Sequence, residues 1–200
     1  SGIWIFLILS GIGIISGAFS VFGAETADVV DYRTFFGFDP RTTVWIIAEL
    51  HLMFGAFVLG VPMFAVTVEY VGVLTKEERY DRLAKDFTRL LSASFALTAA
   101  LGGLLTFALF TLYPKVMTFM SGIFHESFYI YAFFFFGETF VLYFYYYSWD
   151  RLKNRKGIHI SAGVLLNIIG LIIMGISNSW ATYMMSPSGI DPETMKFTGT

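Results

Sequence analysis

Cysteine is absent from this chain of 200 residues, and charged residues are scarce, at 14%. Without cysteine the chain can form no disulfide, thiolate metal site, iron–sulfur cluster or covalently attached c-type haem. The formal net charge of −2 provides no basic surface for binding nucleic acid. Hydrophobic residues make up 56% of the chain, which is unlike a disordered protein and too apolar for a soluble domain. The composition therefore indicates an integral membrane protein that has the lipid bilayer as a partner.

Five long segments with few or no charges predict five transmembrane helices. A helix needs about 20 mostly apolar residues to cross the hydrocarbon core of a bilayer. The apolar runs are continuous and do not alternate, which favours helices over barrel strands. The predicted spans are residues 3–22, 44–73, 90–114, 128–149 and 160–183. We therefore expect an all-α bundle of five transmembrane helices.

The distribution of lysine and arginine predicts the orientation of these spans. Nine of the thirteen basic residues lie in two short stretches, residues 75–90 and 150–156. Positively charged loops stay on the cytoplasmic side, so both stretches are expected inside. The connections at 23–42 and 113–127 and the C-terminus are then expected outside, and the N-terminus inside. We expect the charged stretch between the second and third spans to be a solvated turn.

The first predicted span starts almost at Ser1, without an initiator methionine or a basic flank. We therefore expect that residues upstream are missing from this sequence. A cleaved signal peptide is the alternative interpretation, although the apolar stretch is long for one.

Glu138 is the sharpest functional candidate, because ionisable groups inside a bilayer are costly and rare. Eleven residues without Asp, Glu, Lys or Arg lie on each side of it, which places it near the bilayer midplane. Such a carboxyl group is protonated, paired or turned toward a water-filled cavity. We predict a role in proton transfer or beside a cofactor. The alternative is a neutral glutamic acid that bonds to a helix backbone.

The three histidines are candidates of different kinds. His51 lies inside the second span near its outer end, and imidazole is the usual axial ligand of b-type haem iron. The alternative is a histidine that only packs between helices. His125 and Glu126 begin the fourth span on the same side, where they could provide a second ligand or a solvated interface. His159 is expected at the lipid headgroups. No segment resembles a phosphate-binding loop, a Ser-His-Asp triad or a zinc site, so a hydrolase is not indicated.

Several motifs occur in an order that is typical of one family. They are Ala48-Glu-Leu-His-Leu, Val68-Glu-Tyr-Val-Gly-Val, Ser94-Phe-Ala-Leu, Glu138-Thr-Phe-Val before Trp149-Asp-Arg-Leu, and Asn178-Ser-Trp. From about residue 45 onward the sequence resembles subunit I of the cytochrome bd-type quinol oxidases, which is their large haem-binding subunit. The spacing from the glutamate to Trp-Asp-Arg is the most specific element. The resemblance covers the first four helices of that subunit.

The resemblance implies roles for particular residues. His51 corresponds to an axial ligand of an active-site haem iron, and Glu138 to a buried acid of the haem and proton-transfer region. Glu69, Trp149 and Arg151 correspond to structural positions near the inner face. We include these three, together with His125, among the candidate cofactor-binding residues.

The sequence also departs from the family pattern. The family has a second acid shortly after the Gly-Leu segment of its second helix, and Thr106-Phe-Ala-Leu-Phe contains none. The proline that follows the family's haem-ligand histidine is missing too, with Ala56 in that region. The family's further haem ligands and its quinol loop come later than Thr200. Either a second polypeptide supplies them, which the predicted function requires, or they do not exist here.

These features predict two parts of the chain, an extra N-terminal helix with an outer loop at 1–42 and a bd oxidase-like four-helix domain at 43–200. The predicted function is a haem b-binding subunit of a bd oxidase-like respiratory complex in the prokaryotic cytoplasmic (inner) membrane. It would transfer electrons between the quinone pool and redox partners, with other membrane subunits and outer-face cytochromes as partners. The alternatives are a split-gene terminal oxidase that contains haem d and reduces oxygen, or a haem-free anchor or transporter subunit.

Overall fold

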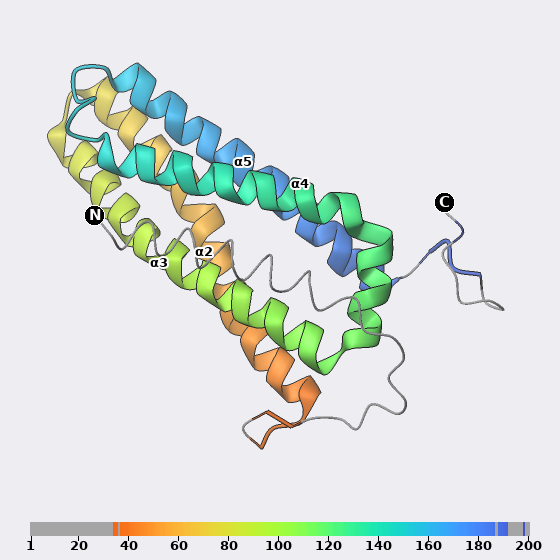
Figure 1. Cartoon of the computed structure of the whole chain (residues 1–200). Coiled ribbons are helices and arrows are strands. Elements are labelled where there is room, and N and C mark those ends of the chain that lie inside the picture. Colours follow the sequence, from red (N-terminus) through yellow and green to blue (C-terminus); the bar gives the residue numbers. More distant parts are fainter. Residues whose placement is uncertain (1–33, 36, 187, 192–197, 199–200) are drawn as a thin grey trace. The chain divides into compact units, whose positions relative to one another are not determined.

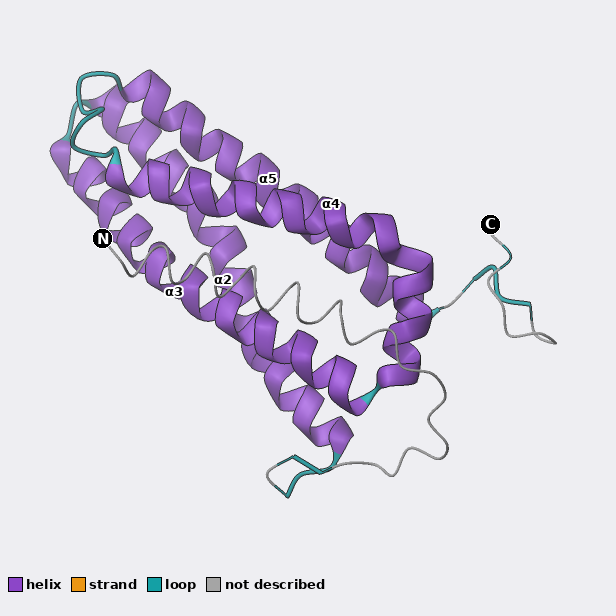
Figure 2. Cartoon of the chain, viewed as in Figure 1, coloured by secondary structure: helices purple, strands orange, loops and turns teal. Residues whose placement is uncertain are grey.

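The described part of the chain consists of four long helices (Figure 1). The computed structural model describes residues 34, 35, 37–186, 188–191 and 198. The helices are α2 (Pro40–Thr75), α3 (Glu78–Leu112), α4 (Pro114–Tyr147) and α5 (Lys156–Met185). Phe35 and Phe38 form an isolated antiparallel bridge, and Figure 2 shows the described residues as helices and loops. The all-α prediction is confirmed for these residues, while the span predicted at 3–22 lies outside them.

Each of the four helices is long and apolar enough to cross a membrane. They contain 30 to 36 residues, whereas a span needs only about 20. Four of the five predicted spans therefore correspond to observed helices, and the chain is a multi-pass membrane protein.

Two segments that were predicted to be connections are helical. The solvated turn expected at residues 76–89 is wrong, because α3 begins at Glu78. Its first turn contains Glu78 and Asp81, and acidic side chains stabilise the N-terminal end of a helix. Most of the connection expected at 113–127 is also helical, because α4 begins at Pro114, and proline suits the first position of a helix. Tyr113 alone separates α3 from α4.

Asp39 caps the start of α2. Its Oδ1 accepts a hydrogen bond of 3.0 Å from the backbone N–H of Thr42, and its Oδ2 accepts one of 2.6 Å from the Thr42 hydroxyl. These bonds from Thr42 hold the pKa of Asp39 below its usual value. Pro40 follows at the first helical position, so the sequence Asp-Pro-Arg-Thr accounts for where the helix begins.

The helices contribute to two compact units. The first unit contains Ser1–His51 and Ala99–Phe119, and the second contains Leu52–Thr98 and Met120–Thr200. In the first unit, the start of α2 packs on the end of α3. Its buried core consists of Ile47, Ala108 and Leu112.

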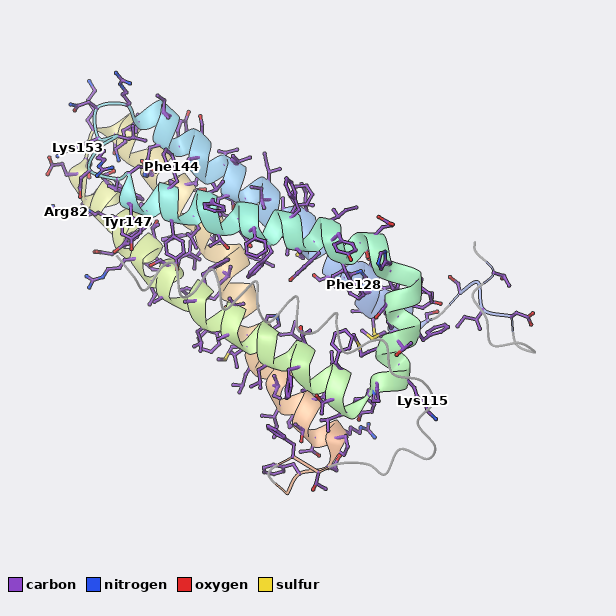
Figure 3. All side chains as sticks on the ribbon, in the orientation of Figure 1. Arg82, Lys115, Phe128, Phe144, Tyr147 and Lys153 are labelled. Atoms are coloured by element: carbon purple, nitrogen blue, oxygen red, sulfur yellow. The ribbon has the colours of Figure 1, made fainter. Side chains whose placement is uncertain are left out.

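In the second unit, all four helices contribute to one core. The buried side chains are Val58 and Val61 of α2, Leu91 and Phe95 of α3, Leu142 of α4, and Leu166 of α5. The α2–α3 and α4–α5 connections lie at the same end of this unit, which we call the basic end and define by residues 75–78 and 148–155 (Figure 1). Figure 3 shows Arg82 and Lys153 at this end.

α4 is kinked at Phe124, where the backbone is not helical (φ −104°, ψ 18°). The hydroxyl of Ser127 donates a hydrogen bond of 2.9 Å to the Phe124 carbonyl. The indole N–H of Trp180 on α5 then donates a bond of 2.8 Å to the Ser127 hydroxyl. The kink is therefore supported by a side chain of the neighbouring helix.

Candidate functional site

His51 lies on α2 in the first unit, with its ring against Gly102 of α3. A Cβ atom added at Gly102 would lie 2.9 Å from Cε1 of the imidazole, 3.4 Å from Nδ1 and 3.6 Å from Nε2. Real Cβ atoms do not approach a neighbour as closely as 2.9 Å, so the ring occupies space that only glycine leaves open. At Gly103, the next residue, an added Cβ would meet nothing within 4 Å. The position of the imidazole therefore depends on one glycine of the facing helix.

Glu138 lies on α4 in the second unit, beside a cavity of about 410 Å³. Its side chain is buried, with 6% of the residue exposed. The cavity is lined by α2, α4 and α5, and its wall includes Gly60, Pro62, Asn167 and Gly170. A Cβ added at Gly170 would lie 3.2 Å from Oε1 of Glu138, so this glycine makes room for the carboxyl group.

The Glu138 carboxyl group accepts no hydrogen bond from the residues that the structure describes. A buried ionised carboxylate without a partner carries a large free-energy cost, which a bound proton or a polar molecule beside it removes. The arrangement is that of a carboxyl group able to hold a proton next to an apolar cavity.

Three buried or half-buried side chains, from Tyr145, Lys156 and His159, meet around Glu69 at the basic end. Both oxygens of Glu69 lie close to Nδ1 of His159, at 2.7 and 2.9 Å. The Tyr145 hydroxyl donates a hydrogen bond of 2.8 Å to Oε2, and the Lys156 ammonium donates one of 3.0 Å to Oε1. Nε2 of His159 lies 2.8 Å from the backbone oxygen of Tyr145. The cluster therefore joins α2, α4 and α5.

Asp81 extends this cluster to α3. It forms an ion pair with Lys156, and the Trp149 indole N–H donates a hydrogen bond of 3.2 Å to its Oδ2. We call Glu69, Asp81, Tyr145, Trp149, Lys156 and His159 the basic-end cluster. Because each of the four helices contributes a side chain, the cluster fixes this end of the second unit.

Comparison with known proteins assigns the four described helices to one family. A family model for cytochrome bd terminal oxidase subunit I matches residues 40–198. The chain belongs to this family. The match includes all four described helices and every motif on which the resemblance rests. No curated protein matched the sequence.

The donor chemistry of this cytochrome bd family member fits a haem better than a bare metal ion. No group of three or more His, Cys, Asp or Glu side chains that could hold a metal ion occurs among the described residues. A haem iron needs only axial ligands from the protein, because the macrocycle supplies the others. The imidazole of His51, held against Gly102 by close contact, is suited to that role.

The structure places the other predicted site residues in three different surroundings. Glu69 and Trp149 are buried in the basic-end cluster. Arg151 is exposed and lines a small hollow at the same end with Phe144 and Tyr147, which Figure 3 labels. The His125 side chain is 59% exposed, with Nδ1 3.7 Å from Glu126. Their roles toward a cofactor stay predictions.

The placement expected for His159 at the headgroups is wrong, because the residue is 0% exposed. Neighbouring basic residues suggested a solvated position, whereas the imidazole turns inward to Glu69. Sequence analysis also missed Asp81, Tyr145 and Lys156 as members of the cluster. A signal was present, since a glutamate inside an apolar span requires a partner, and the cationic side chains of the next loops were available to it.

Proposed function

We propose that this chain is a haem b-binding membrane subunit of a bd oxidase-like respiratory complex that transfers electrons between the quinone pool and redox partners. The observation that supports the proposal is the imidazole of His51 seated against Gly102, in a chain of the cytochrome bd subunit I family. A bound haem would supply a one-electron carrier whose potential depends on axial ligand, burial and nearby charge.

The chain itself would hold and orient this group. A ring nitrogen of His51 would provide the axial ligand, and contact with Gly102 would fix the plane of the imidazole. Glu138 would hold a proton near the middle of the membrane, because its carboxyl group faces an apolar cavity and no described residue bonds to it.

The orientation of the chain in the membrane and its partner subunits belong to the same proposal. The basic end would face the cytoplasm of a prokaryote and the start of α2, which contains His51, would lie toward the outer face. Other membrane subunits would supply the remaining haem ligands and the quinol site, and outer-face cytochromes would exchange electrons with the complex.

The proposal is tested by the reduced-minus-oxidised visible spectrum of the purified complex. We expect b-type bands, and we expect His51→Ala to remove the absorbance of one haem. Gly102→Ala moves the ring without removing it, so we expect a shifted band or midpoint potential. Gly103→Ala is the matched control and leaves the spectrum unchanged, because its Cβ meets nothing.

Three kinds of spectrum separate the possible functions, and His51→Ala tests the proposed ligand. Bands of the b type alone support an electron-transfer subunit, whereas an additional d-type band identifies a terminal oxidase. Unchanged haem content in His51→Ala contradicts the proposed ligand. A complex without haem absorbance would indicate that the chain is a haem-free anchor or transporter subunit.

Glu138→Gln tests the proposed proton carrier. The amide keeps the size of the side chain but cannot bind and release a proton at neutral pH. We therefore expect slower quinol-linked turnover with an altered pH profile and an unchanged haem spectrum. A wild-type rate and pH profile would return Glu138 to a structural role.

A further inference from the structure

His159 in the basic-end cluster contacts hydrogen-bond acceptors through both ring nitrogens. Nδ1 lies 2.7 and 2.9 Å from the two Glu69 oxygens, and Nε2 lies 2.8 Å from the Tyr145 carbonyl oxygen. A neutral imidazole has one N–H donor and one acceptor nitrogen, so it can satisfy only one of these contacts. The geometry therefore requires one more proton, either on the ring or on Glu69.

The surroundings of Glu69 indicate that this proton is on the ring. The Tyr145 hydroxyl and the Lys156 ammonium both donate to the carboxyl group, which thus receives donors from α4 and α5 besides His159. An ionised carboxylate accepts several such bonds, whereas a protonated one must itself donate. Glu69 is therefore the carboxylate and His159 the imidazolium.

The charges of the cluster balance in this state. Glu69 of α2 and Asp81 of α3 are negative, and Lys156 and His159 of α5 are positive. Tyr145 of α4 and Trp149 of the α4–α5 connection also face the imidazole; both are uncharged and lie against its ring. Buried charges are tolerated when they are paired and hydrogen-bonded, and loss of the His159 proton would leave one negative charge uncompensated.

Lys156 and Asp81 connect the buried pair to water. The side chains of Glu69 and His159 are fully buried, whereas those of Lys156 and Asp81 are 18% and 27% exposed. Lys156 contacts both acids, so polar contacts run without a break from the surface to His159. One turn further along α5, the side chain of Val66 and the ring of Tyr145 fill the space over Gly163. Apolar packing therefore closes the cluster on the side away from the basic end.

We propose that the basic-end cluster is a proton-binding site, in which His159 takes a proton from the aqueous phase through Asp81 and Lys156 and holds it as an imidazolium on Glu69. The proton comes from solvent and returns to it, so no other reactant takes part. The site consists of residues of this chain and does not depend on a bound haem.

Nitrogen NMR of the full chain in lipid nanodiscs tests the proposal directly. The sequence contains three histidines, so ¹⁵N-histidine labelling gives three ring systems, and His159→Gln identifies the signals of His159. In the wild-type chain at neutral pH we expect both ring nitrogens of His159 to be protonated. Glu69→Gln removes the carboxylate, and we expect the ring to lose one N–H signal.

The entry route is tested by hydrogen exchange of the His159 ring protons with water. We expect Asp81→Asn to slow this exchange while the ring stays protonated. Asp150→Asn is the matched control, because Asp150 is an exposed acid outside the cluster, and it leaves both measurements unchanged. A neutral His159 ring in the wild-type chain, which includes the case of a protonated Glu69, overturns the site. Unchanged exchange in Asp81→Asn overturns the route. The wild-type spectrum decides the first point even where a variant fails to fold.

Discussion

Gly163 determines how closely α5 approaches α2 and α4. A Cβ at this position would overlap Val66 and lie 3.0 Å from Cε2 of Tyr145. Overpacking of this kind destabilises a fold by about 1–3 kcal/mol. We expect Gly163→Ala to lower the free energy of unfolding by this amount, measured by denaturant titration in detergent micelles.

Gly175→Ala provides the control on the same helix. An added Cβ there meets nothing within 4 Å, so the substitution should leave stability unchanged or raise it slightly. Equal stability of the two alanine variants would contradict the close approach at Gly163.

Single residues differ in how far the sequence could predict them. His51 and Glu138 stand out because each is ionisable within a long apolar run, a local property that the sequence shows directly. The pairing of Glu69 with His159 joins residues 90 positions apart in the chain, and only the packing of α2 on α5 creates it. The sequence alone does not reveal the importance of Gly102 either, because it depends on the His51 ring, which reaches Gly102 of α3 from α2.

Each of the four helices overlaps its predicted span, but α3 and α4 begin well before theirs. Hydropathy detects the part of a helix that lies in lipid, and charged residues mark the end of that part rather than the end of the helix. α3 therefore begins at Glu78, well before the apolar segment that starts near residue 90. α4 similarly begins at Pro114, and its kink at Phe124 separates the early turns from the long apolar part.

The ion pair of Lys85 with Asp150 connects α3 to the α4–α5 connection. Lys85 Nζ donates hydrogen bonds of 2.8 and 2.9 Å to the two oxygens of Asp150. The bond from Lys85, together with its charge, lowers the pKa of Asp150 below its usual value. Because the folded pKa lies below that of the unfolded chain, the pair stabilises the fold above about pH 4, and its contribution is lost in stronger acid.

Asp150→Asn measures this contribution. The Asp150 side chain is largely exposed, so we expect a small loss of stability at pH 7 that decreases with added salt. The difference between variant and wild type should become smaller at about pH 3, because protonation of Asp150 weakens the pair as the pH falls toward its lowered pKa. Thermal unfolding at the two pH values checks this, and a difference that does not decrease in acid would rule out the ion pair as its source.

At the scale of the whole molecule, the orientation in the membrane is open to a direct test. The chain contains no cysteine, so single cysteines can be introduced without a background. In right-side-out vesicles we expect a membrane-impermeant maleimide to label Lys115→Cys, since Lys115 lies in the first turn of α4. Lys153→Cys, at the basic end, should react only after the membrane is permeabilised. The reverse pattern would show that the basic end faces outward.

The short link between α3 and α4 is a poor place to insert a tag or to divide the chain. A single residue, Tyr113, joins them, so an insertion at this turn would push the end of α3 and the start of α4 apart. The α4–α5 connection at residues 148–155 is longer and reaches solvent. This connection is therefore the better place for an affinity tag. It also suits a break that divides the gene into two co-expressed halves. Either change should come after Lys153, away from the buried Trp149.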